Sequence, residues 1–576
     1  MPLPLLAILV LVVLFLGYHF YGKFIARVFI PTDKNQTPAH TFNDGVDFVP
    51  TKPFYLLSQH FSAIAAAGPI AGPILAAQNF GWLPCLLWIG FGVVFIGAVH
   101  DFGALMASVR HKGNSIAEII RENIGSKAAL AMMGFIWLAL LYVIVAFTDI
   151  TASTFLGKSE ELQGLNVSFN RGGAVAMASA LYLALSIVLG IIQKKFNPPL
   201  WLVTLVFVPA TLGAVWLGTH WDGFFVMGQK SWGLTILAYC FVASLLPVWM
   251  LLQPRGYLGG FVLYMALAVG TLGLFFGGYE ITQPAFKTWQ APGLTGSLFP
   301  FLFVTIACGA CSGFHGLVCT GTTSKQIDKE THCHPVGYGA MLMEGFVAVM
   351  ALTTFMILPA SQAVGPPAQV YGAGLGQFLT LIIGKENLVF AMTFGAMAFS
   401  TFVFDTLDVA TRLGRYIIQE LTGLKNFWGA ALGTGLTVAI PAFFLLSAKE
   451  GSWTLFWVLF GTSNQMLAAL TLLGISIWLK KSGKKYWFTF YPMIFVMGMT
   501  VWSLFKQITM GLTQWQTTGF GTPAINAAIG IMLLLLAGFM VMEAGRVWKK
   551  NKYKLGGGPY YSSRDILHDR CGKNRL

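Results

Sequence analysis

Apolar residues occur in runs of about 20 along most of the chain, and short polar or basic segments separate the runs. An α-helix of that length crosses the hydrocarbon core of a bilayer, which is about 30 Å thick. The pattern therefore predicts an all-α polytopic membrane protein with about fifteen spanning helices. The expected spans are residues 3–21, 55–78, 83–107, 128–155, 172–192, 198–217, 232–253, 257–279, 299–320, 336–360, 387–409, 427–447, 452–478, 487–506 and 523–545.

The composition of the 576-residue chain agrees with that prediction, since 56% of its residues are hydrophobic and only 10% are charged. An ordinary soluble domain carries about 25% charged residues, so the soluble enzyme classes become poor candidates. Most of the seven cysteines fall within the apolar runs, where a cysteine acts as a small hydrophobic residue. No disulfide framework is expected.

The formal charge of +14 is unevenly distributed along the chain. If the N-terminus faces outward, all but seven of the 36 lysines and arginines fall in cytoplasmic segments, which is the usual bias of membrane proteins. The charge therefore predicts an outer N-terminus and a cytoplasmic C-terminus, and it requires no nucleic-acid partner. The seven basic residues expected outside are Lys158, Arg171, Lys230, Lys287, Lys385, Lys449 and Lys506.

Two expected spans contain helix-breaking residues. Span 55–78 includes the run Gly68–Pro73, with two Gly-Pro pairs, and span 232–253 includes Pro247. A break frees backbone polar groups that hydrocarbon cannot satisfy, so it is tolerated where it lines a cavity. The two spans lie five apart and enter from opposite sides, as in the inverted repeats of secondary transporters. Considered alone, Pro247 is equally well explained as a tolerated kink.

This pairing predicts a five-plus-five inverted-repeat core whose first and sixth helices are broken. Amides and dipole charge at the helix N-termini of the break near Gly68 would bind a substrate carboxylate. The predicted organisation is an extra helix and cytoplasmic loop at 1–54, a core at 55–409 with repeats 55–217 and 232–409, additional helices at 410–545, and a basic cytoplasmic tail at 546–576.

Few ionisable residues fall inside the expected spans, and each one is expensive to bury there. The ones selected as candidates are His100, Asp101, Asp149, His315, Glu344, Asp405 and Asp408. Asp101 and Glu344 lie far from the span ends, which favours a role in binding and releasing a coupling proton. Asp405 and Asp408 lie near Arg412, which favours a gate. Solvation at the helix ends is the alternative for all four acids.

Hydroxyl groups gather at the inner end of span 299–320, at Ser312, Thr320, Thr322 and Thr323. Together with carbonyls freed near Gly68, they offer the oxygen ligands that sodium prefers, although helix-to-helix hydrogen bonds explain them equally well.

Two cysteine motifs are rejected. Cys308-Gly-Ala-Cys311 lies in mid-helix without the setting of a redox motif, and the adjacent residues of His332-Cys333-His334 cannot all face one zinc. No metal site, cofactor or catalytic constellation is expected, so the chain is predicted not to be an enzyme.

Several longer segments resemble the carbon starvation protein A (CstA) family of bacterial inner-membrane transporters. They are Asn43–Pro50, His60–Pro73, His100–Phe102, Phe299–Ala310, Ser312–His315, Gly321–Thr323, Met341–Glu344, Asp408–Arg412 and Phe460–Gln465. The resemblance implies a LeuT-type fold and uptake of peptides, or of pyruvate in some relatives, during nutrient limitation. The chain is a short form, since it lacks a leading helix and has a much shorter segment between 360 and 390.

The function expected from these observations is uptake of short peptides, driven by a proton or sodium gradient. The alternatives are a pyruvate/proton symporter and a starvation sensor that binds the ligand without moving it. The residues expected to bind substrate are Ala67, Gly68, Pro69, Gly72, Pro73, Pro247, Ser312, Gly313 and His315. Those expected to couple the ion are Asp101, Glu344, Thr322 and Thr323, and the gate is assigned to Asp405, Asp408 and Arg412. The oligomeric state is left open.

Overall fold

The computed structural model describes residues 2–45, 47–157, 159–162, 167–291, 296–424, 426–448, 453–519 and 521–550, and most of these are helical. Twelve helices in the described part are long and apolar enough to cross a membrane, or thirteen if one bent pair counts as a span. The prediction of a polytopic helical membrane protein is therefore confirmed, while the number of spans is lower than the fifteen expected.

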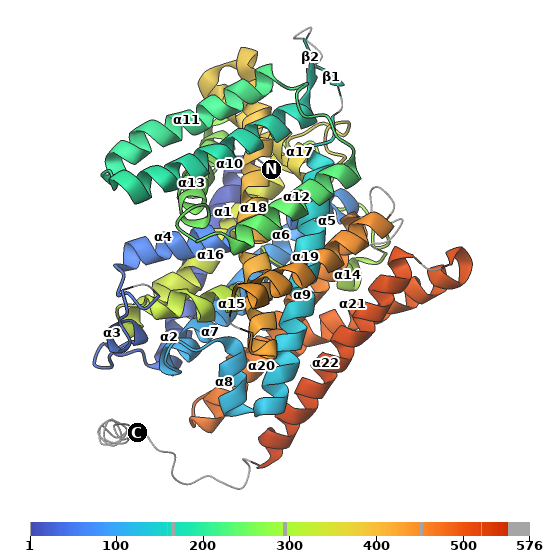
Figure 1. Cartoon of the computed structure of the whole chain (residues 1–576). Helices are drawn as coiled ribbons and strands as arrows, with labels where there is room; N and C mark the ends of the chain where they lie inside the picture. The colour runs from blue at the N-terminus through green and yellow to red at the C-terminus, as the bar shows by residue number, and fades with distance from the viewer. Residues whose placement is uncertain are drawn as a thin grey trace.

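The helices of the first half are α1 (Leu3–Leu16), α2 (Lys23–Phe29), α3 (Pro38–Thr41), α4 (Pro53–Ile64), α5 (Gly68–Phe80), α6 (Trp82–Gly92), α7 (Ala98–Arg110), α8 (Ile116–Asn123), α9 (Ser126–Thr154), α10 (Arg171–Phe196) and α11 (Leu200–His220). Two short antiparallel strands, β1 (Ser159–Leu162) and β2 (Val167–Asn170), pair between α9 and α10 (Figure 1).

The helices of the second half are α12 (Gln229–Leu245), α13 (Leu252–Phe276), α14 (Leu298–Thr305), α15 (Gly313–Gly321), α16 (Ala340–Met356), α17 (Pro367–Ile383), α18 (Leu388–Thr422), α19 (Phe427–Ser447), α20 (Trp453–Lys481), α21 (Trp487–Thr518) and α22 (Thr522–Lys550). Helix α22 thus includes the first residues of the predicted tail, and 551–576 lie outside the described residues.

The backbone is non-helical at Pro247, as predicted, but this stretch connects two helices rather than interrupting one. Helix α12 ends at Leu245, and Pro247 lies in the turn that leads to α13. The residue before a proline is driven toward extended backbone, and Leu246 has φ −68° and ψ 149°. Two arginines of α18 bind the carbonyls left free at this end of α12. Arg412 donates to the carbonyls of Ala243 and Leu246, and Arg415 donates to that of Ser244.

A second broken helix does exist, but in the expected span 299–320. Helices α14 and α15 are separated by the non-helical residues 306–312. The first break lies between α4 and α5, which bend by 43° across 65–67. The run Gly68–Pro73, expected to be unwound, is instead helical and begins α5 with Pro69 in its first turn. A proline there costs little, because the first amides of a helix have no partner within it.

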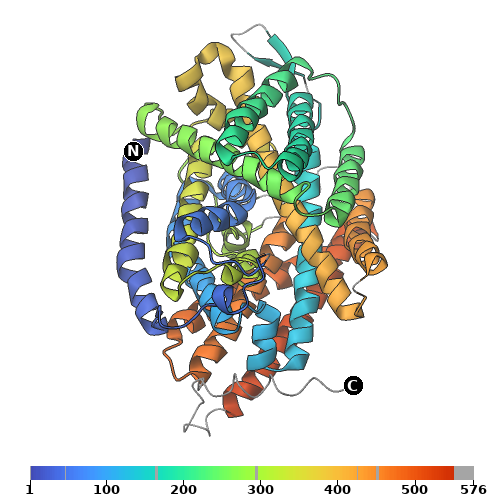
Figure 2. The same cartoon turned by 60° about the vertical axis from the view of Figure 1, so that its left-hand side comes forward.

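Burial separates an inner set of helices from an outer set. The apolar window of α20 is 100% buried and that of α9 is 83% buried, whereas those of α11 and of Leu3–Phe29 are only 28% and 33% buried. Exposed apolar side chains on the outer helices suit contact with lipid. The N-terminal end of α1 and the C-terminal end of α22 lie toward opposite ends of the molecule (Figure 2). Helix α17, which the sequence analysis did not anticipate, packs against α18.

Candidate functional site

The two broken helices pack against each other in opposite directions, with their breaks side by side. We call this region of contact, between 60–73 and 305–323, the crossing. A Cβ added to Gly68 would lie 2.4 Å from Sγ of Cys308, and one added to Gly72 would lie 2.6 Å from the carbonyl oxygen of Thr305. Both distances are far below van der Waals contact, so only glycine permits this approach. At the other end of the crossing, Nδ1 of His60 lies 2.9 Å from Oγ1 of Thr323.

Side chains from two other helices satisfy the backbone groups that the second break leaves free. The indole N–H groups of Trp88 on α6 and Trp457 on α20 donate to the carbonyls of Ile306 and Thr305, each at 3.2 Å. Oδ1 of Asn464 on α20 accepts from the amide of Phe314, at 2.9 Å, in the first turn of α15. The break is therefore a supported structure, as hydrocarbon requires.

Most of the residues expected to bind substrate lie at this crossing. They are Ala67, Gly68, Pro69, Gly72 and Pro73 on the α5 side, and Ser312, Gly313 and His315 on the α15 side, and all are buried. Pro247 lies instead in the turn between α12 and α13. The structure thus joins two segments separated by more than 200 residues in the sequence, and it leaves Pro247 outside both breaks.

A buried charged cluster, composed of His100, Asp101, His315 and Glu344, adjoins the crossing. Nδ1 of His315 lies 3.0 Å from Oδ2 of Asp101, and its Nε2 lies 3.2 Å from Oε2 of Glu344. Nδ1 of His100 lies 2.7 Å from the other oxygen of Asp101. The side chains are at most 1% exposed. One imidazole therefore links the two carboxylates that the sequence analysis assigns to coupling.

This arrangement is suited to holding and moving a proton. An imidazole exchanges its proton near neutral pH, and in its cationic form both ring nitrogens are donors. Among the described residues, neither carboxylate oxygen of Glu344 nor Nε2 of His100 has a hydrogen-bond partner, and Oε2 of Glu344 meets His315 as an ion pair only. The cluster therefore retains unused acceptors on Glu344 and one unused nitrogen on His100.

The hydroxyl groups expected to hold sodium are engaged in other contacts. The Thr322 hydroxyl donates to the carbonyl of Val318 at 3.0 Å, and Thr323 contacts His60. The Thr320 hydroxyl donates to Gly316. These are the local hydrogen bonds that threonine commonly makes near a helix C-terminus.

A second buried cluster, composed of Arg255, Asp405, Asp408 and Tyr239, lies between α12, α13 and α18. The guanidinium of Arg255 is fully buried, and its two terminal nitrogens lie 2.6 Å from a carboxylate oxygen of Asp405 and of Asp408. The hydroxyl of Tyr239 donates to Asp408 at 3.0 Å. The two acids assigned to a gate thus share Arg255 as their ion-pair partner, whereas Arg412 binds backbone carbonyls of α12.

The segment 31–52 lies against the residues that follow α15. The amide of Thr32 donates to Glu330 at 3.0 Å, and Nε2 of His40 lies 2.8 Å from Asp328. Nearby, in the loop between α20 and α21, Lys484 donates to the carbonyl of Phe29 at 2.7 Å. Burial lowers the pKa of Lys484 to about 8. These contacts hold the segment 31–52 against the residues that follow Thr323.

Sequence reasoning missed several residues of the site. His60 falls inside an expected span but was not selected, and Arg255 falls between two expected spans and was taken as part of a loop. Trp88 and Trp457 carry no recognisable motif. Asn464, inside the expected span 452–478, was not selected as a site residue either, and it accepts from the amide of Phe314.

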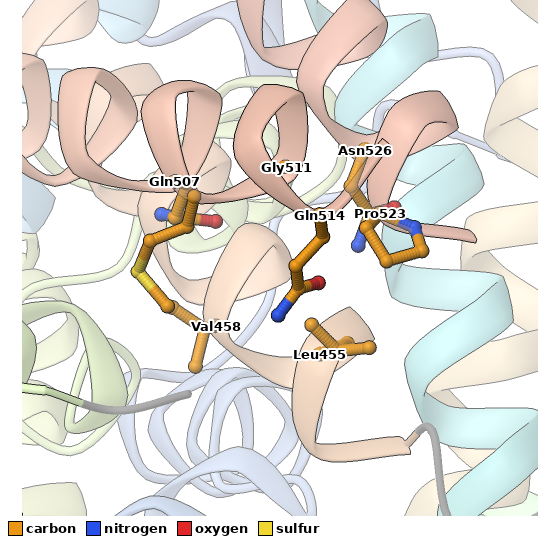
Figure 3. Close-up of a pocket in the computed structure, with 8 residues that line it drawn as sticks. Leu455, Val458, Gln507, Gly511, Gln514, Pro523 and Asn526 are labelled. Carbon is orange, nitrogen blue, oxygen red and sulfur yellow. The ribbon is translucent and has the colours of Figure 1, made fainter. Parts of the chain in front are cut away.

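A small cavity of about 30 Å³ lies between α20, α21 and α22, apart from both breaks (Figure 3). Its amide side chains are already used, since Gln507 donates to Thr462 and Ser503, and Asn526 accepts from Tyr142. A space of this size holds about one water molecule, so it does not accommodate a transported solute.

Comparison with known proteins was consistent with a transporter. The family model "Carbon starvation protein CstA" matches residues 4–365 and 360–503. The Peptide transporter CstA of Campylobacter jejuni is 33% identical, over 86% of this chain and 78% of its own length. The Pyruvate/proton symporter BtsT of Escherichia coli is 30% identical, over 85% and 79%.

Among solved structures, a variant of the manganese transporter of Eremococcus coleocola aligns with a TM-score of 0.43 at 14% identity, covering 86% of this chain and 96% of that chain. This likeness is too distant to carry an argument. The family match and the named relatives confirm the prediction of a transporter rather than an enzyme. On the evidence of a family model that covers most of its length, this chain belongs to the CstA family.

Proposed function

We propose that this chain is a secondary-active importer of short peptides in the bacterial inner membrane, used during carbon starvation and driven by protons. The observation that carries the proposal is the crossing of two broken helices beside a buried histidine that links two carboxylates. Broken helices of opposite direction are typical of the binding sites of secondary transporters. Pyruvate is the alternative substrate, because one relative is named for it.

The substrate carboxylate is expected at the N-terminal end of α5. The amides in the first turn of a helix have no partner within that helix, and the helix dipole places partial positive charge there. Ala67 and Gly68 form this end, and both are buried in the described conformation. Both short peptides and pyruvate carry a carboxylate, so the same feature serves either. A peptide also brings an ammonium group, for which the acids of the neighbouring cluster are suitable partners.

Protons are favoured over sodium as the coupling ion. Asp101, His315 and Glu344 form a continuous chain of titratable groups, and Glu344 retains an unused acceptor. Because His315 belongs to α15, a proton taken up there changes the charge of the broken helix itself.

The two broken helices, 53–80 and 298–321, run in opposite directions as in an inverted repeat, but they lie seven expected spans apart rather than five, so the predicted division into 55–217 and 232–409 is not retained. We place the N-terminus in the periplasm and the C-terminus in the cytoplasm, following the distribution of lysine and arginine. The ion pairs of Arg255, in the first turn of α13, with Asp405 and Asp408, near the middle of α18, then serve as a gate.

The test is uptake by the purified chain in proteoliposomes, with labelled dipeptide and labelled pyruvate compared under imposed pH and sodium gradients. Accumulation of dipeptide driven by the pH gradient alone is expected. Accumulation of pyruvate instead would select the alternative substrate, and dependence on sodium would overturn the coupling assignment. Binding of either solute without accumulation would indicate the sensor rather than the importer.

A further inference from the structure

Three side chains that are able to bind a metal ion lie close together beside the crossing. They are His60 on α4, Asp101 on α7 and Cys319 on α15, and all three are buried. One ligand atom of each lies within 4.8 Å of those of the other two. Nε2 of His60 and Sγ of Cys319 are 3.8 Å apart. Imidazole nitrogen, thiol sulfur and carboxylate oxygen are the three donor types that zinc uses in proteins.

The distances suit an ion with tetrahedral coordination. Ligand atoms about 2.0–2.3 Å from a tetrahedral zinc lie roughly 3.5 Å from one another. The observed atoms lie within 4.8 Å of one another, so they need to approach by at most about 1.3 Å. Water, or one of the histidines that contact Asp101, is available as the fourth ligand.

The surroundings of these residues also resemble the supporting shell of a metal site. Nδ1 of His60 contacts the hydroxyl of Thr323 at 2.9 Å, and a proton donated there leaves the lone pair of Nε2 directed at Cys319. Asp101 is fixed by His100 and His315, one on each oxygen. Metal ligands are commonly oriented by such hydrogen bonds, which set the tautomer and the ring orientation.

We propose that the chain binds one divalent transition-metal ion of the zinc class at His60, Asp101 and Cys319. Binding replaces the thiol proton of Cys319 by a bond from sulfur to the metal, and that proton is released to solvent. The ligands belong to three separate helices, including one half of each broken helix. A bound ion therefore ties α4 to α15 and arrests any movement of the crossing.

Access to the site depends on that movement, since all three side chains are closed off from water. The ion enters only when α4 and α15 separate. Metal binding is therefore expected to be slow, and to inhibit transport by trapping one conformation. The proposal does not depend on which solute is carried, nor on protons being the coupling ion.

The test uses the full-length chain purified in detergent and titrated with cobalt(II), whose bond to a thiolate gives a charge-transfer absorption band. We expect about one cobalt per chain, displaced by zinc. Cys319→Ser should remove the band, and His60→Gln should weaken binding at least about tenfold, equal to about 1.4 kcal/mol.

Cys571→Ser is the matched control, because the C-terminal tail carries its own cysteine and histidine, and it should leave the band unchanged. A band that persists in Cys319→Ser, or that disappears in Cys571→Ser, would overturn the proposal. If Cys319→Ser does not fold, alkylation of the unmodified chain decides the matter. Zinc should slow alkylation of Cys319, measured by mass spectrometry of the peptide that contains it, and an unchanged rate would exclude the site.

Discussion

Two buried clusters each place one cation between two carboxylates, and they differ in which cation it is. In the cluster beside the helix breaks, His315 links Asp101 and Glu344. In the cluster between α13 and α18, Arg255 links Asp405 and Asp408. The side chains of Arg255 and His315 are at most 1% exposed, so water does not solvate either of them.

The difference determines what each cluster is able to do. An imidazole exists both with and without its second ring proton, whereas a guanidinium keeps its charge at any pH that a cell experiences. The histidine cluster is therefore suited to exchanging protons, and the arginine cluster is suited to holding helices together until it is broken. Only the histidine cluster adjoins the crossing of α5 with the second break. In the proposed function, coupling therefore belongs to the first cluster and locking to the second.

The largest effect on the histidine side is expected from Gly68→Leu. Its Cβ would lie 2.4 Å from Sγ of Cys308, so the two breaks would be pushed apart. Uptake should be abolished while membrane insertion stays largely normal. Gly90→Leu on α6 is the control, because a Cβ there meets nothing within 4 Å. Uptake is measured in proteoliposomes with matched protein content. Retained uptake in Gly68→Leu would remove this segment from the binding site.

On the arginine side, Arg255→Gln should destabilise the folded protein by about 3–5 kcal/mol, because the buried carboxylate of Asp408 and the partly exposed carboxylate of Asp405 lose their partner. Thermal unfolding in detergent measures the loss. Adding Asp405→Asn and Asp408→Asn to Arg255→Gln should restore much of the stability, since the uncompensated charges are then gone. An Arg255→Gln chain as stable as the unmodified one would show that Arg255 does not serve as a lock.

Coupling is tested by Asp101→Asn and Glu344→Gln, each of which keeps the shape and removes the charge. Accumulation driven by a pH gradient should fall at least about tenfold, an effect of about 1.4 kcal/mol. Counterflow exchange at fixed pH should persist, because it requires no net proton movement. Asp149→Asn, whose native carboxylate accepts from Gln229 outside both clusters, is the control. Normal accumulation in both Asp101→Asn and Glu344→Gln would eliminate these residues as the proton site.

The smallest effect is expected from Trp88→Phe, which removes the indole donor to the carbonyl of Ile306. The unpaired buried carbonyl should cost about 1–3 kcal/mol and lower the uptake rate. Trp82→Phe loses a similar bond, to Gln283 in the loop beyond α13, and serves as the control. Equal losses of uptake in the two variants would show that the donor at the break has no special role.

The length of the apolar runs predicted most of the spanning helices, because lipid requires a spanning helix to be long and apolar along its length. Twelve expected spans coincide with observed spanning helices. The other three, 55–78, 232–253 and 299–320, contain short or broken helices. Hydropathy does not reveal a break when the residues around it remain apolar. The segment 306–312 contains no proline and therefore gave no signal, whereas the proline at 247 gave a misleading one.

The candidate site was anticipated in its acids and not in their partners. Asp101 and Glu344 attract notice because a carboxylate inside an apolar run is costly. That both contact His315 depends on how α7, α15 and α16 pack, which no local pattern encodes. His60 and Arg255 were missed for a similar reason, since their importance arises from helices distant in sequence. The roles assigned to these residues stay predictions.

The support that α20 gives to the second break has a consequence for how the chain is made. During synthesis, the carbonyl of Thr305 and the amide of Phe314 enter the membrane about 150 residues before the Trp457 and Asn464 that satisfy them. Until then, these groups must stay hydrated or be shielded by the insertion machinery, because lipid offers them nothing. A nascent chain stalled before residue 453 therefore leaves these two backbone groups without their partners. We expect it to be most susceptible to quality-control proteases at that stage.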